Sequence, residues 1–200
     1  MKPIPAQRKG AHHTTAHAVR VASEQDARKA FDNARQRLID VNRWHDVAGE
    51  GSAKFQVVDE EGKELEATVK EGNYLRITIQ NIPATAVGDG DDWVKVEKIR
   101  EENNSNYQMI AVRVRPAVPP FASDREIAHF FSPEATSTFC IERTKTKLRA
   151  AVYGRNEKPN TNASTLWAKI RNLGVAIGAM VGLNKSQWKS LVKGLVDKSL

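Results

Sequence analysis

Apolar and polar residues alternate through the middle of this chain, and a period of two is the pattern of a strand with one buried face. Gly-containing turns at 60–63 and 71–73 separate the runs at intervals of about ten residues, which predicts a meandering antiparallel sheet. Because each run has one apolar and one polar face, we expect the sheet to be covered on one side only. The expected strands are 16–21, 55–57, 65–69, 75–79, 94–96, 110–114, 135–142 and 147–154.

A helix is predicted between the first two strands. Ser23 is its expected N-cap, acidic residues occupy its first turn, and apolar residues follow at helical spacing until it ends near Trp44. These apolar positions are Ala27, Ala30, Phe31, Ala34, Leu38 and Val41. Farther along the chain, residues 123–131 fit a helical turn and an irregular connector equally well, so the path of residues 116–134 stays open.

The longest expected element is a C-terminal helix over Ala163–Leu200. Its apolar stripe consists of Leu166, Ile170, Leu173, Ile177, Met180 and Val181. Gly174, Gly178 and Gly182 lie beside that stripe, and each costs about 1 kcal/mol relative to alanine in a helix. They allow either close approach of another backbone or room for a ligand, and both explanations stay open. Gly182 and Asn184 also fit a helix end and a new N-cap, so a break there stays open.

Composition and length favour one ordinary globular domain. The chain has 200 residues, of which 40% are hydrophobic and 28% charged. We expect a flexible N-terminal tail over 1–14 and a single domain over 15–200. The single cysteine, Cys140, excludes an internal disulfide and fits a reducing compartment, and no apolar stretch follows the cationic N-terminal residues. The apolar run 173–183 is shorter than the ~20 residues of a membrane span. The expected location is cytoplasmic.

The net charge of +7 is unevenly distributed. From Arg143 onward, the chain has 12 Lys and Arg residues and only two acidic residues, Glu157 and Asp197. Residues 1–142 have a net charge of −3. An alternative function is therefore an interaction module whose basic C-terminal third binds an anionic partner, with a membrane surface as one candidate. Nucleic acid is disfavoured because no aromatic residues interleave the charges. The simpler explanation is that these side chains solvate one helix face: Lys169, Arg171, Lys185, Lys189 and Lys193.

No metal site or cofactor is expected. His12, His13 and His17 lie in or beside the tail with no Cys or carboxylate at ligand spacing. Asp89, Asp91 and Asp92 lack the spacing of a calcium loop, which favours a solvated turn before the strand of Trp93. The sequence contains no P-loop, dinucleotide glycine fingerprint, paired C-x-x-C or G-x-S-x-G.

Covalent catalysis is weakly supported. Residues 186–189 and 190–193 both match S-x-x-K, but the partner motifs S-D-N and K-T-G are missing. Cys140 with His129 as its base is a second candidate, and a small buried cysteine is the commoner explanation. Arg113 lies on the polar side of its strand and is expected to be exposed.

Three stretches carry a family resemblance. The first is 21–24 leading into the helix that ends at Asn42-Arg43-Trp44-His45, the second is 138–142 with 147–154, and the third is the helix from Leu166. They are similar to the opening helix, the penultimate hairpin and the closing helix of the SRPBCC superfamily, the START-like and polyketide-cyclase-like proteins. The resemblance covers 15–197 and implies an α+β helix-grip fold, with a six- to seven-stranded antiparallel sheet wrapped around a long C-terminal helix.

The resemblance also implies a function. Such proteins hold a small hydrophobic or amphipathic ligand, such as a lipid or polyketide-like molecule, in a cavity between sheet and helix. It favours a non-enzymatic role, and cyclase or dehydrase chemistry is the enzymatic alternative. An enclosed apolar pocket of a few hundred Å³ is expected. Residues from different elements are the expected cavity lining: Trp44, Trp93, Tyr107, Tyr153, Trp167, Gly174, Gly178 and Met180.

Overall fold

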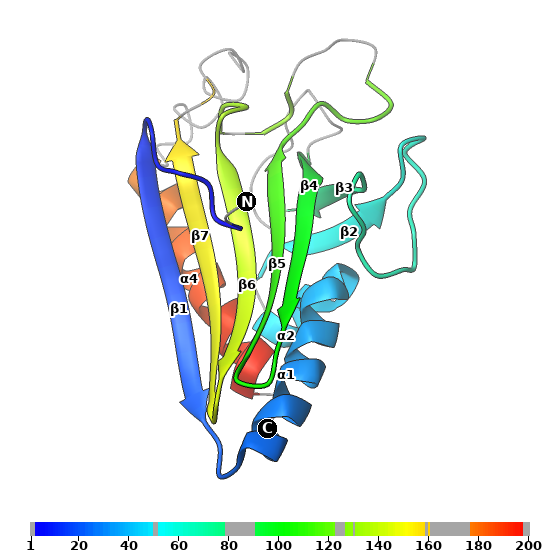
Figure 1. Cartoon of the computed structure of the whole chain (residues 1–200). Helices are drawn as coiled ribbons and strands as arrows, with labels where there is room; N and C mark the ends of the chain where they lie inside the picture. The colour runs from blue at the N-terminus through cyan, green and yellow to red at the C-terminus, as the bar shows by residue number, and fades with distance from the viewer. Residues whose placement is uncertain are drawn as a thin grey trace.

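The computed structural model describes residues 3–49, 52–78, 91–122, 127–129, 131–158, 160 and 177–197, with only the backbone described from 177 to 185. Its centre is a seven-stranded antiparallel sheet in the order β1-β7-β6-β5-β4-β3-β2 (Figure 1). The strands are β1 Ala11–Arg20, β2 Lys54–Val58, β3 Tyr74–Thr78, β4 Asp92–Asn103, β5 Tyr107–Pro116, β6 Thr136–Thr144 and β7 Lys147–Glu157. This arrangement confirms the predicted α+β helix-grip fold.

The helices pack against one another on one face of the sheet; in Figure 1, α4 lies behind β6 and β7, and α1 lies beside the lower ends of β4 and β5. They are α1 Glu24–Ile39, the 3-10 helix η1 Val41–Arg43, α2 Trp44–Ala48 and α4 Ile177–Asp197. We call the covered face the inner face; on β5 it carries Ile110, Val112 and Val114, which belong to the main core. The other face is the outer face. No helix in the described ranges is both long and apolar enough to cross a membrane.

The predicted first helix is confirmed at its start and differs at its end. The Ser23 hydroxyl accepts a hydrogen bond from the Asp26 N–H at 3.1 Å, and every predicted apolar position is buried. The helix ends at Ile39, before the expected Trp44, because the backbone leaves helical geometry at Asp40. The chain then turns, and the Trp44 indole donates to the carbonyls of Arg37 and Leu38 at 3.2 Å each. Trp44 is thereby folded back into the core.

The sheet begins earlier in the chain than predicted. β1 pairs with β7 from Ala11 opposite Glu157 to Arg20 opposite Lys147, so residues 11–14 belong to the sheet rather than to a flexible tail. The segment before it is also held. The Asn156 side chain accepts from the Arg8 N–H at 2.7 Å, and Gln7 accepts from the Asn156 N–H at 2.9 Å. The sequence pattern predicted a strand only from residue 16, because polar side chains point to both faces of the sheet in the first part of the edge strand β1.

The predicted strand at 65–69 is absent. The Leu65 N–H donates to Val57 at 2.8 Å, but the Leu65 carbonyl accepts from the Asn42 side chain, and the Val69 N–H donates to Ile39 at 2.9 Å. The segment therefore makes one backbone-to-backbone hydrogen bond to β2, and other backbone groups bind Asn42 and Ile39, at the end of α1, so no strand ladder forms. Leu65 and Val69, two of the alternating apolar residues of this segment, pack against the main core.

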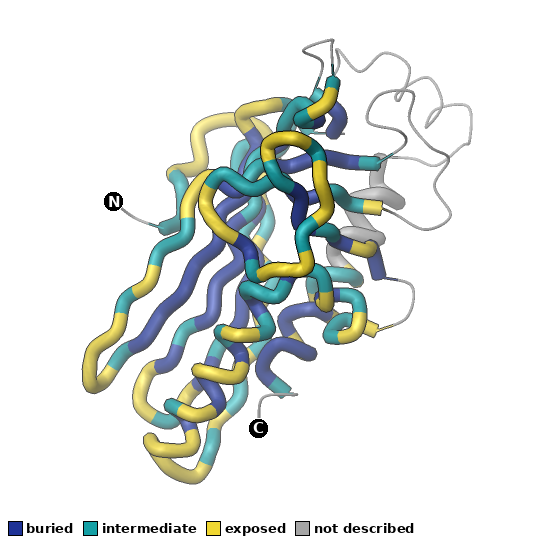
Figure 2. Tube along the Cα trace, turned by 90° about the vertical axis from the view of Figure 1, so that its right-hand side faces the viewer, coloured by how far each residue is buried: buried dark blue, intermediate teal, exposed yellow. Residues whose placement is uncertain are grey.

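The outer face is more buried than the one-sided prediction allowed. Met109, Ala111 and Cys140 form a small apolar cluster there, with Tyr107 and Tyr153 packed against it. Arg113, expected to be exposed, is only 8% exposed because its guanidinium lies along the sheet against Glu97, with Nε and the carboxylate 2.7 Å apart. Figure 2 shows the resulting buried stretches along the central strands.

The helix α4 is continuous through Gly182 and Asn184, so the break that the sequence left open does not occur. Its C-terminal half buries Leu191, Val192, Leu195 and Val196 against the core. In the part of α4 whose side chains are described, the backbone of α2 approaches Gly194 closely. A Cβ atom at Gly194 would collide with the Val47 carbonyl. Gly174 lies outside the described residues, and the surroundings of Gly178 and Gly182 are not described.

Candidate ligand-binding cavity

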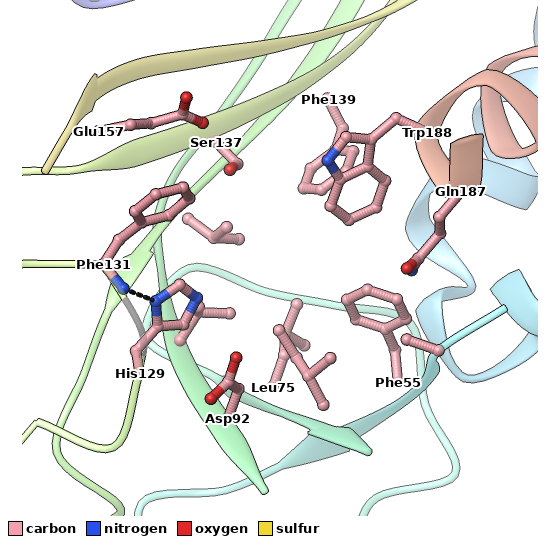
Figure 3. A pocket seen from close by; sticks show the side chains of 14 residues that line it. Phe55, Leu75, Asp92, His129, Phe131, Ser137, Phe139, Glu157, Gln187 and Trp188 are labelled. Carbon is pink, nitrogen blue, oxygen red and sulfur yellow. Dashed lines mark hydrogen bonds between the residues drawn. The ribbon is translucent and has the colours of Figure 1, made fainter. Parts of the chain in front are cut away.

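A cavity lies between the inner face of the sheet, Gln187 and Trp188 of α4, and the side chains of His129 and Phe131 (Figure 3). Its volume is about 50 Å³, and about 590 Å³ when all space not occupied by atoms, including open solvent, is counted. The volume of about 50 Å³ is smaller than the few hundred Å³ expected. The lining residues are Ala53, Phe55, Leu75, Ile77, Asp92, Val94, Val114, His129, Phe131, Ser137, Phe139, Glu157, Gln187 and Trp188.

Aromatic rings close the cavity on the α4 side. The Trp188 ring lies 5.3 Å from Phe139 and 6.2 Å from Phe55, centroid to centroid. Trp44 lies against both phenylalanines, at 4.6 Å and 5.1 Å. Strand alternation places Phe55 and Phe139 on the inner face, and α4 brings Trp188 over them. Trp44 with Phe55 and Phe139 with Trp188 pack edge to face, which is a favoured arrangement of aromatic rings, so this wall is apolar and packed.

Asp92, the first residue of β4, places a carboxyl group in the cavity. It is 8% exposed, and burial raises the pKa of its carboxyl from 3.8 to about 7, with a further contribution from the charge of Asp91. Among the described residues, no cationic side chain forms an ion pair with it. The solvated turn expected for Asp92 is therefore wrong: pairing with Ile77 on β3 draws the residue into the sheet.

His129 faces the same cavity on a short segment that is held at several points. The Trp93 N–H donates to the Ala128 carbonyl at 2.7 Å, and the buried Asn160 amide donates to the His129 carbonyl at 3.1 Å. Nδ1 of His129 accepts from the Phe131 N–H at 2.9 Å, which assigns the ring proton to Nε2. Burial lowers the pKa of the imidazole to about 3, so the ring is neutral. In Figure 3 the ring lies above the Asp92 carboxyl.

Glu157 contributes a second carboxyl at the opposite side of the cavity. Its Oε1 lies 3.0 Å from Nδ1 of His13 on β1, and its side chain is 9% exposed. Gly154 makes this arrangement fit, because a Cβ atom there would collide with both the carboxylate and the His13 ring. The carboxyl group of Glu157 thus has a side-chain partner that Asp92 lacks among the described residues.

The predicted aromatic residues that the structure describes do not line this cavity. Trp44 lies in the core behind Phe55 and Phe139. Trp93 packs in a separate cluster with Val58 and Ala128, and Tyr107 and Tyr153 lie on the outer face. Trp167 and Gly174 are outside the described residues; Gly178 and Met180 lie in α4, where only the backbone is described.

The other candidate chemical groups are also separated. Cys140 lies in the outer-face cluster and His129 faces the inner cavity, so the sheet stands between the proposed thiol and its base. Burial raises the pKa of the thiol, which opposes formation of a nucleophilic thiolate. The three N-terminal histidines lie in β1, and no three His, Cys, Asp or Glu side chains cluster as metal ligands in the described part of the chain.

The described residues of the basic C-terminal third do not form one continuous charged surface. Arg143 is fully buried and donates to Gln108 at 2.5 Å, and Arg149 pairs with Glu142 at 2.8 Å on the outer face. Lys189 and Lys193 are exposed on α4, as the simpler explanation of the charge requires.

No family model matches this chain, and no curated protein matches its sequence. The fold is similar to the crystal structure of a hypothetical protein from Helicobacter pylori, with a TM-score of 0.51 and 14% identity over 100% of this chain and 99% of the other. A truncated norcoclaurine synthase from Thalictrum flavum is more distant, at 0.34 and 9% identity over 94% and 99%. A major latex-like protein from Panax ginseng has a TM-score of 0.34 and 8% identity over 82% and 95%. The first likeness supports the fold, and fold and cavity together define a helix-grip protein with an internal cavity.

Proposed function

We propose that this protein is a member of the SRPBCC superfamily that binds a small hydrophobic or amphipathic ligand between the sheet and α4. The observation that supports the proposal is the cavity on the inner face, which has apolar walls and a few converging polar groups. That combination is typical of small-molecule sites. Phe55, Phe139 and Trp188 supply the apolar surface, whereas Asp92 and His129 supply polarity.

The size of the cavity limits how the ligand lies. A cavity volume of about 50 Å³ accommodates roughly four water molecules, since one water needs about 10–15 Å³ by the same measure. A ligand of ordinary size is larger than this, so one end of it lies in the cavity and the remainder extends into the adjoining solvent. A larger protein side chain in the cavity should then exclude the ligand.

Ile77 and Ile99 form a matched pair for this test. Both are partly buried isoleucines packed against the inner-face core, on neighbouring strands, but only Ile77 lines the cavity. We expect Ile77→Phe to reduce octanol affinity at least about tenfold, which corresponds to about 1.4 kcal/mol, and Ile99→Phe to retain the wild-type affinity. Titration calorimetry measures the affinities, and native mass spectrometry of protein from cells reports any co-purified ligand.

Two results would contradict the proposal. One is a wild-type protein that neither carries a ligand from cells nor binds octanol. The other is equal octanol affinity in Ile77→Phe and wild type, since a molecule bound elsewhere is indifferent to this side chain.

A further inference from the structure

We propose that the ligand is an amphipathic primary amine whose ammonium group pairs with the Asp92 carboxylate inside the cavity. The inference rests on the proposed function and names the chemical class of its ligand. It follows from the distribution of charge around the cavity.

The described lining is acidic and has no permanent cation. Asp92 and Glu157 both contribute carboxyl groups, whereas the other polar lining residues are Ser137, His129 and Gln187, and no Lys or Arg lines the described wall. An anionic ligand would meet like charge in a site shielded from water, where such repulsion is strong. The cavity therefore selects against fatty acids and similar anions.

Asp92 is the carboxyl group that a ligand can satisfy. A buried carboxylate without a partner is unfavourable, and a cation brought by the ligand offsets that cost. Glu157 already lies 3.0 Å from His13. Asp91, next to Asp92, has Arg76 at 3.5 Å, and Arg76 also binds Glu64. The Arg76 guanidinium is thus engaged by two other carboxylates, those of Asp91 and Glu64.

His129 does not serve as the missing cation. Its Nδ1 accepts the Phe131 N–H, and protonating Nδ1 would direct two N–H groups at each other. The ring therefore stays neutral beside Asp92, consistent with its buried position. The groups that face or adjoin Asp92, namely Asp91, Arg76, His129 and Glu157, leave its charge uncompensated among the described residues.

The remaining wall suits an apolar body. Leu75 and Phe55 lie on the same side of the cavity as the carboxyl in Figure 3, and Val94 and Phe139 also line the cavity. An alkyl or aryl chain attached to the ammonium group would contact these side chains while the charged end reaches Asp92. A hydrogen bond to a charged group contributes about 1.5–3 kcal/mol, and hence roughly ten- to hundredfold in affinity.

The test compares three probes of equal length by titration calorimetry: octylamine, octanol and octanoate. At about pH 8, where an alkylammonium is still protonated, we expect octylamine to bind roughly ten- to hundredfold more tightly than octanol, with octanoate weakest. Amine affinity should increase with pH between about 6 and 8, because pairing needs the ionised carboxyl, while octanol affinity stays constant.

Asp92→Asn should abolish the amine preference, measured as the ratio of octylamine affinity to octanol affinity in the same variant, whereas the neighbouring control Asp91→Asn should retain that ratio. Octanoate binding as tightly as octylamine, or an amine preference that survives in Asp92→Asn, would overturn the inference. If Asp92→Asn does not fold, the wild-type comparison across pH decides the matter alone. Octanol binding without an amine preference refutes only this inference, whereas no binding of any probe refutes the proposed function as well.

Discussion

Ionisation of Asp92 opposes folding. The pKa of its carboxyl is about 7 in the folded chain against 3.8 as a reference, so the folded state holds the proton more tightly. The free energy of unfolding contributed by this group therefore falls as pH rises from about 4 to 7, by up to about 4 kcal/mol, and is constant above. Asp92→Asn cannot ionise, so its stability relative to wild type should increase across that interval.

Urea unfolding of both proteins at several pH values measures this difference. His129 acts in the opposite direction, because its pKa is lowered from 6.5 to about 3 and stability is lost as pH falls through 6.5. In wild type the two effects partly cancel, so its free energy of unfolding changes less with pH than Asp92 alone would cause. The difference in this free energy between wild type and Asp92→Asn reports the contribution of Asp92. A difference that does not change with pH would mean that Asp92 is solvated in the folded state.

Single residues of the site were hard to predict from the sequence for a physical reason. Asp92 lies in an acidic, Gly-rich stretch, and nothing local shows that pairing with Ile77 will bury it. His129 reaches the cavity only because Trp93 and Asn160, distant in the chain, hold its segment. The inward orientation of Phe55 and Phe139 could be predicted from strand alternation alone, because they share a face with Val57 and Ile141.

At the scale of elements, the contact between α2 and α4 depends on the missing side chain of Gly194. A Cβ atom there would collide with the Val47 backbone, which cannot move as a side-chain end can. We expect Gly194→Ala to lower the free energy of unfolding by about 1–3 kcal/mol, although alanine favours a helix by about 1 kcal/mol elsewhere. Lys193→Ala, an exposed neighbour on α4, should change stability by less than about 0.5 kcal/mol.

Urea denaturation of the two variants distinguishes strain from helix propensity. A stabilised Gly194→Ala would show that α2 moves aside freely and that the close approach is not required. The sequence indicated a glycine series on this helix, but spacing alone could not show which glycine meets a backbone. That depends on the partner helix, whose boundary at Trp44 also differed from the periodic prediction.

Most helices and strands could be predicted from the sequence, because the period of the apolar residues differs between a helix and a strand with one buried face. The partners of their backbone hydrogen bonds could not be predicted. Residues 65–69 alternate like a strand, yet Asn42 and Ile39 take their backbone hydrogen bonds. Polar residues 11–14 do not alternate, yet β7 pairs with them. In both cases, contacts distant in the chain override the local pattern.

For the whole molecule, strand order predicts unequal stability across the sheet. β5 and β6 are central, flanked by paired strands, and buried on both faces, whereas β2 is a five-residue edge strand next to the five-residue β3. Amides of β5 and β6 should therefore exchange with deuterium most slowly and those of β2 and β3 much faster. This weaker end contributes Phe55, Leu75 and Ile77 to the cavity wall. Octylamine bound there should slow exchange in β2, β3 and residues 127–129, and leave the β6–β7 turn at Lys145 unchanged. Slowing confined to that distant turn would place the ligand outside the cavity.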